Sequence, residues 1–112
     1  MILTYSIDGD PGVVEKIGTT TSAIGLTATT YAPTSGIFKG MSARAAVVQV
    51  LTAPVNITLD GTTPTVAAGT DMGLTMAAGT SRVITGANTV MNLQVINTAA
   101  SNGAVVKVEP YF

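Results

Sequence analysis

Short stretches in which apolar and polar residues alternate are the dominant pattern along this chain. From Val55 onward, apolar side chains at positions 55, 57 and 59 alternate with polar ones until Asp60-Gly61 interrupts the pattern. A period of two residues is the signature of a β-strand with one buried face. No window of about a dozen residues carries apolar positions at helical spacing. The sequence therefore predicts an all-β protein.

Six strands are predicted from this alternation and from the Val, Ile and Thr residues that favour extended backbone. Gly, Pro, Asn and Ser separate the strands and indicate a hairpin at Ala53-Pro54 and turns at residues 78–80 and 101–103. Short strands at this spacing are typical of an antiparallel β-sandwich or a jelly-roll-like domain. The strands are expected at residues 42–52, 55–60, 73–77, 81–85, 89–97 and 104–112.

The first 35 residues differ from the rest because they hold little apolar bulk. Residues 18–36 are uncharged, rich in Thr and punctuated by Gly, whereas residues 13–17 predict a short strand or a helical turn. Two interpretations remain open: residues 1–35 add edge strands to the domain, or they form an extended arm that docks on a neighbouring subunit. The chain is thus divided into an extended N-terminal segment, residues 1–35, and a β-sandwich domain, residues 36–112.

Composition makes the core small and the surface weakly charged. Apolar residues make up 46% of the 112 residues but aromatic residues only 4%, so the core is expected to consist of Val, Ile, Leu, Met and Ala. Charged residues make up 10%, far below the usual quarter, and the net charge is -1. Few charges give little protection against self-association. Such a surface suits a protein that works in contact with its own copies or with other proteins.

The residues that usually perform acid–base or nucleophilic catalysis are scarce in this sequence. The chain contains no His and no Cys, and its six carboxylates stand at no spacing that guarantees a pair. We therefore predict that the protein is not an enzyme and that it uses no cofactor and no small-molecule substrate.

Motifs for nucleic acid, phosphate or membrane binding are missing as well. The five basic residues are scattered and form no basic face with stacking aromatic rings. The glycine-rich stretches contain no Lys and lead into no predicted helix, as a phosphate site would require. No apolar run reaches the length of a membrane span. We expect neither nucleic acid nor a membrane among the partners.

Two Asp-Gly stretches raise the question of a binding site. Asp8, Asp10 and Gly12 resemble half of a calcium loop, but the further acidic ligands of such a loop are absent, so a turn stiffened by Pro11 is the preferred interpretation. In the second stretch, Asp60 is expected to accept hydrogen bonds from amides just ahead, Gly61 to adopt positive φ and Pro64 to fix the exit. We therefore predict a structural turn at residues 60–64 and no metal site.

The block from Gly36 to Phe112, with "LDGTTPT" at residues 59–65 and the closing strand "AVVKVEPYF", resembles small proteins encoded in the structural gene clusters of tailed phages and prophages. The resemblance implies a virion component assembled in the host cytoplasm, specifically a capsid decoration or cement protein. Such proteins are β-sandwiches or jelly rolls that sit as trimers on the shell. The implied partners are further copies of the chain, as a homotrimer, and the major capsid protein or other virion proteins. A tail or baseplate component remains an alternative.

If copies of the chain associate, large side chains near the N-terminal segment and at the C-terminus are the candidates for the contact. Interface anchors are enriched in aromatic residues, and each candidate could equally pack inside its own subunit. The candidates are Tyr31, Ile37, Phe38, Tyr111 and Phe112.

The stretch "ITLDGTTPT" also resembles a turn of Ig-like accessory domains in secreted glycosidases, which implies carbohydrate binding as a second alternative. Sugar platforms use exposed aromatic rings, whereas this chain has no Trp and offers only Tyr5, Tyr31 and Tyr111.

Overall fold

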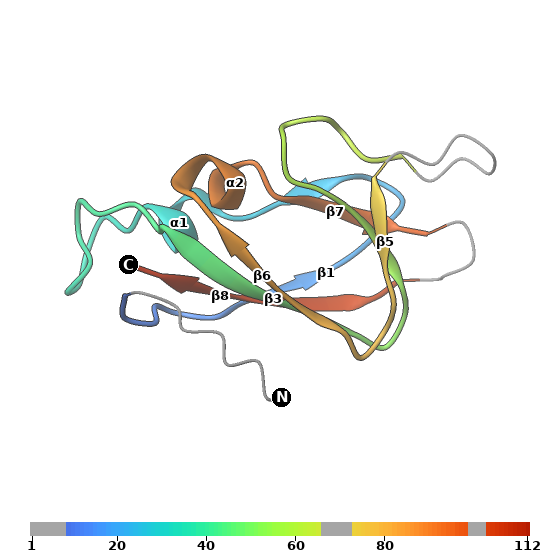
Figure 1. The fold of residues 1–112 in the computed structure, drawn as a ribbon, viewed down its shortest axis with the longest axis horizontal. Coiled ribbons are helices and arrows are strands. Elements are labelled where there is room, and N and C mark those ends of the chain that lie inside the picture. Colours follow the sequence, from blue (N-terminus) through green and yellow to red (C-terminus); the bar gives the residue numbers. More distant parts are fainter. Residues whose placement is uncertain (1–8, 66–72, 99–102) are drawn as a thin grey trace, which may run out of the picture.

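The computed structural model describes residues 9–65, 73–98 and 103–112, which form two antiparallel four-stranded sheets packed face to face (Figure 1). The first sheet has the order β1 (Glu15–Gly18), β8 (Val105–Tyr111), β3 (Ala45–Leu51) and β6 (Ser81–Thr85). The second has the order β2 (Ile24–Gly25), β7 (Gln94–Asn97), β4 (Val55–Thr58) and β5 (Leu74–Met76). The predicted all-β sandwich is confirmed. Two short helices, α1 (Ala28–Tyr31) and α2 (Ala87–Met91), lie near the C-terminus at one end of the sandwich.

The core lies between the two sheets and consists mainly of β-branched side chains. In β3, Val48 and Val50 point inward and are fully buried, whereas Gln49 between them is exposed on the outer face. β8 pairs with β3 along its whole length, so that Val108 lies opposite Val48 and Val106 opposite Val50. Inward residues of the second sheet, including Val55 of β4, complete the same core cluster.

The prediction of a hairpin at Ala53-Pro54 is wrong, because the two strands that flank these residues belong to different sheets. β3 pairs with β6 and β8, and β4 pairs with β5 and β7. The chain turns at Thr52, which has a φ of 71°, and crosses from the first sheet to the second. The turn expected at residues 78–80 is present, since the N–H of Thr80 donates to the carbonyl of Ala77. It also links strands of different sheets, β5 and β6.

The strand expected over residues 89–97 begins only at Gln94, because its first part is the helix α2. Gly86 has a φ of 100° and ends β6 with a turn that few other residues adopt. Within this segment, the buried residues Val90 and Leu93 stand three positions apart, which is a helical and not an alternating spacing. Burial of both residues in the core therefore favours a helical turn over a strand.

Residues 15–25 belong to the sandwich, because they provide one edge strand to each sheet. β1 pairs with β8, where Ile17 lies opposite Val106, and β2 pairs with β7, where Ile24 lies opposite Val95. Ile17 is buried in the core and Ile24 packs against it. Residues 1–8 and the tip of the turn expected at 101–103 lie outside the described residues.

Candidate functional site

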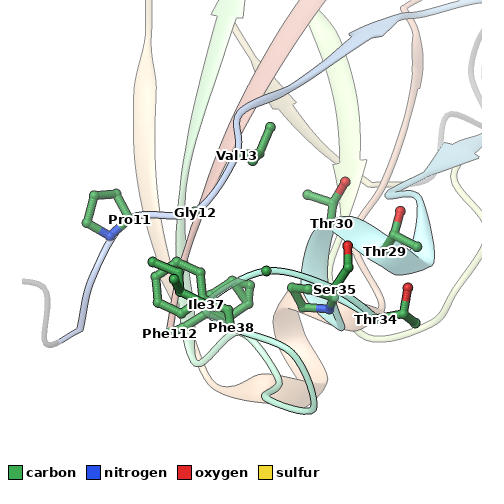
Figure 2. Close-up of a pocket in the computed structure, with 12 residues that line it drawn as sticks. Pro11, Gly12, Val13, Thr29, Thr30, Thr34, Ser35, Ile37, Phe38 and Phe112 are labelled. Atoms are coloured by element: carbon green, nitrogen blue, oxygen red, sulfur yellow. The ribbon is translucent and has the colours of Figure 1, made fainter.

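An apolar groove of about 740 Å³ lies between the N-terminal segment, the helix α1 and the C-terminus. Figure 2 shows residues 11–13 on one side of the groove, α1 and the loop after it on the other, and two phenylalanines at its floor. We call it the terminal groove. Its lining carries no charged side chain. It consists of Pro11, Gly12, Val13, Thr29, Thr30, Pro33, Thr34, Ser35, Gly36, Ile37, Phe38 and Phe112.

The floor of the groove is a stacked pair of phenylalanines from distant parts of the sequence. The ring centroids of Phe38 and Phe112 lie 4.6 Å apart, with an angle of 21° between the ring planes. Phe112 is buried, and its backbone exchanges two hydrogen bonds with Asp10, of 2.9 and 3.0 Å. Phe38 is half-buried against the core and completes the floor. Phe112, which directly follows β8, is thus held in place by the N-terminal segment.

The N-terminal wall is a β-bulge, and Pro110 accounts for its position. Pro11 lies opposite Tyr111 and Glu15 lies opposite Val108, so three residues of the N-terminal segment face only two of β8. Pro110 accepts a 2.7 Å hydrogen bond from the Gly12 N–H but has no N–H to donate in return. The ladder is interrupted at this point, and bulges of this kind redirect side chains.

The bulge has two consequences for the groove. Val13 is turned out of the sheet, so that its side chain is 85% exposed at the rim of the groove. Gly12 packs directly on the floor, because a Cβ at this position would lie 3.0 Å from the Phe112 ring and 3.2 Å from Pro110. A larger residue at position 12 would therefore displace either the wall or the floor.

The opposite wall is held by a single carboxylate from β1. Glu15 accepts hydrogen bonds from the N–H of Thr27 at 3.0 Å, from the Thr27 hydroxyl at 3.0 Å and from the Thr30 hydroxyl at 2.5 Å. Thr27 is the N-cap residue of α1 and makes no side-chain cap of its own. A carboxylate that accepts from the N–H of the N-cap residue makes the contact that the acidic partner of a capping box makes.

Replacement of this carboxylate is expected to loosen the wall. Glu15→Ala removes the acceptor of three hydrogen bonds and should lower the free energy of unfolding by about 1 kcal/mol, a modest value because the bonds lie near solvent. Glu15→Gln keeps one side-chain oxygen and should lose less. Urea denaturation followed by circular dichroism measures both values. Equal midpoints for the wild type and Glu15→Ala would contradict the capping role.

Three of the five predicted interface residues meet in the terminal groove, namely Ile37, Phe38 and Phe112. The other two do not line it. Tyr31 is half-buried against the core, and Tyr111 lies on β8, where its hydroxyl donates to a carboxylate oxygen of Glu109. This hydrogen bond is the main cause that raises the pKa of Tyr111 above 10.0, and desolvation and the charge of Glu109 act in the same direction.

The sequence interpretation missed Val13 as a member of the groove. Val13 stands in an apolar pair with Val14, which indicates a strand residue and no exposure. Two features of the sequence could have indicated that Val13 is exposed, namely Gly12 beside it and Pro110 in the closing strand. Neither can be used before the register between the two segments is known.

The stretch at residues 60–64 forms a turn. The N–H of Thr62 donates to Oδ1 of Asp60 at 3.0 Å, Gly61 has a φ of 89° and Pro64 is fully buried. Hydrogen bonds from the backbone and then the side chain of Thr62 lower the pKa of Asp60 below its ordinary value of 3.8. In the other Asp-Gly stretch, the backbone of Asp10 pairs with Phe112, and Asp8 lies outside the described residues.

Within the described residues, no group of three or more His, Cys, Asp or Glu side chains is placed to hold a metal ion. In the same part of the chain, no helix has the length and hydropathy needed to cross a membrane. Comparisons with protein-family models, with curated proteins and with solved structures find no significant match to this chain.

Proposed function

We propose that the protein is a non-enzymatic structural subunit of a tailed-phage virion, a capsid decoration protein that stabilises the head through protein–protein contacts. The proposal joins the resemblance of residues 36–112 to phage structural proteins with the chemistry of the terminal groove. Its partners are further copies of the chain, as a homotrimer, and the major capsid protein.

The observation that carries the proposal is the exposed apolar rim of the terminal groove. Val13 and Ile37 are 85% and 88% exposed, and they flank a hollow whose floor is aromatic. Exposed apolar surface that is gathered in one place marks an interaction site more often than surface that is scattered. Because no charged side chain lines the groove, contacts there rest on apolar burial and hydroxyl groups. This composition suits a lasting contact with another protein surface.

Small contacts of this kind can stabilise a large shell because they are repeated. A standard interface buries about 1,600 Å² in total. Subunits that are linked to one another gain avidity on a lattice without any new chemistry. A charge-poor sandwich of 112 residues that presents its rim to neighbours is adequate for this role.

The test uses particles of the phage or prophage that carries the gene. Deletion of the gene is expected to leave heads that release their DNA at a lower temperature, and addition of the purified protein should restore the wild-type temperature. Mass spectrometry of wild-type particles should detect the chain.

Two other results would replace the proposal. Stable heads on particles that fail to adsorb would assign the chain to the tail or baseplate. Micromolar binding to an immobilised glycan, lost in Tyr31→Ala or Tyr111→Ala, would assign it to carbohydrate-binding modules.

A further inference from the structure

We infer that the terminal groove is the surface through which copies of this chain contact one another, with Ile37 of one copy seated in the groove of the next. The inference rests on the proposed function in one respect, namely that the protein works as an assembly of its own copies. It goes further by assigning the contact to one end of the sandwich and to named side chains.

The first argument is that a protruding apolar side chain and a hollow of matching chemistry lie side by side. Ile37 stands on the loop after α1 and is 88% exposed, the highest exposure among the large apolar side chains of the described residues. The hollow beside it has an aromatic floor formed by Phe38 and Phe112. A twofold contact brings the same patch of each copy together, and residues close to a threefold axis also meet their own copies. A patch that contains both the knob and the hole can therefore complement itself.

The loop that carries Ile37 has a defined shape. Gly36 has a φ of 81°, the N–H of Gly40 donates to the carbonyl of Pro33 at 3.1 Å, and the N–H of Met41 donates to that of Phe38 at 3.0 Å. Ile37 is thus presented on a turn closed by backbone hydrogen bonds. Little further ordering is needed when it enters a hollow, which lowers the cost of association.

The second argument concerns charge. Near a rotation axis each charged side chain meets its own copy, so a self-associating patch should be free of charge at its centre. None of the twelve residues that line the groove has a charged side chain. The charges that flank the lining along the sequence have opposite signs, because Asp10 precedes Pro11 of the N-terminal wall and Lys39 follows Phe38 of the floor. When Ile37 of one copy lies over Val13 of the other copy, Lys39 of the first copy approaches Asp10 of the second. Complementary charges at a rim favour the correct pairing.

The test measures oligomeric state by native mass spectrometry and by light scattering after size exclusion. The wild-type protein is expected to be an oligomer, and Ile37→Glu should weaken its association about 100-fold because a charge enters an apolar contact. Ile37 is exposed, so this variant should keep the wild-type circular dichroism spectrum. Leu74→Glu is the matched control, because Leu74 is 62% exposed on β5 and does not line the groove. It should remain an oligomer.

A charge exchange separates direct contact from an indirect effect. Ile37→Lys alone and Val13→Glu alone should each be monomeric, and a mixture of the two should form mixed oligomers because the lysine of one variant meets the glutamate of the other.

A wild-type monomer at every concentration, or equal dissociation of Ile37→Glu and Leu74→Glu, would overturn the inference. A monomer that still restores head stability would overturn the inference and the proposed homotrimer, and would leave the decoration role standing. If Ile37→Glu dissociates and Leu74→Glu does not, the inference is supported. If deletion of the gene also leaves the heads equally stable, the proposed function is rejected.

Discussion

Deletion of residues 1–27 is expected to yield a chain that does not fold. The deletion removes β1 and β2, the edge strands that cover β8 and β7. It takes Ile17 and Leu26 out of the core and exposes Val106 and Val95, which are fully buried. Burial of one such side chain contributes about 1.5–3 kcal/mol. Four of them amount to most of the 5–15 kcal/mol by which a small domain is stable.

The measurement is thermal unfolding followed by far-ultraviolet circular dichroism. The truncated chain should show no cooperative transition, whereas the full chain should show one. Two substitutions in β1 provide the matched comparison, because Ile17→Asp places a charge in the core and Lys16→Asp changes an exposed neighbour. The first should abolish the transition and the second should shift it little. A cooperative transition in the truncated chain would show that residues 28–112 fold without either edge strand.

The fold class could be predicted from the sequence because it depends on local chemistry. Val, Ile and Thr favour extended backbone at each position, and Gly and Pro interrupt it, so strands appear as alternation between breaks. Which strands pair is a different question. The turns after β3 and β5 contain ordinary turn residues, and no residue in these turns indicates that the chain crosses to the other sheet there. The helix α2 was missed because residues 89–97 were interpreted as one strand, although the buried Val90 and Leu93 stand at helical spacing.

The terminal groove could be predicted only in part. Scarcity of aromatic residues drew attention to Phe38 and Phe112, but their stacking depends on the register of β8, which brings the last residue beside the loop after α1. Val13 depends on a bulge that arises where Pro110 cannot donate a hydrogen bond. The carboxylate of Glu15 reaches α1 from a strand twelve residues earlier. Each of these contacts joins segments whose adjacency the sequence does not state.

Alternation in β4 was also a weaker guide to exposure than to strand formation. Val55 and Ile57 face the core as expected, but the polar residues Asn56 and Thr58 are buried too. The stretch from Asp60 to Thr65 folds back over this outer face, where the hydroxyl of Thr58 donates to the carbonyl of Thr62. The Asp-Gly turn therefore covers a strand with the chain that follows it. A polar residue in an alternating strand can be a buried anchor for its own turn.

Asn56→Asp is accordingly expected to destabilise the protein strongly and in a pH-dependent way. Asn56 is fully buried, its Nδ2 donates to the carbonyl of Thr65 at 3.2 Å, and its Oδ1 accepts from the Thr75 hydroxyl at 2.8 Å. A carboxylate at this position turns the first contact into two facing oxygens and buries a charge. The expected loss at pH 7 is about 3 kcal/mol.

The sign of the pH dependence follows from burial, which raises the pKa of the introduced carboxyl above the value of about 3.9 that it has in the unfolded chain. Below that value the carboxyl is protonated in both states and can donate to Thr65, so the variant should approach wild-type stability. As the pH rises through the folded-state pKa, the unfolded state releases its proton more readily and stability falls. Asn56→Leu should lose about 2 kcal/mol at every pH, and Asn88→Asp, at an exposed position on α2, should be nearly neutral. Urea denaturation between pH 3.5 and pH 7, compared with the wild type at each pH, separates these outcomes. A constant difference for Asn56→Asp across this range would show that position 56 is open to water and that the turn does not seal it.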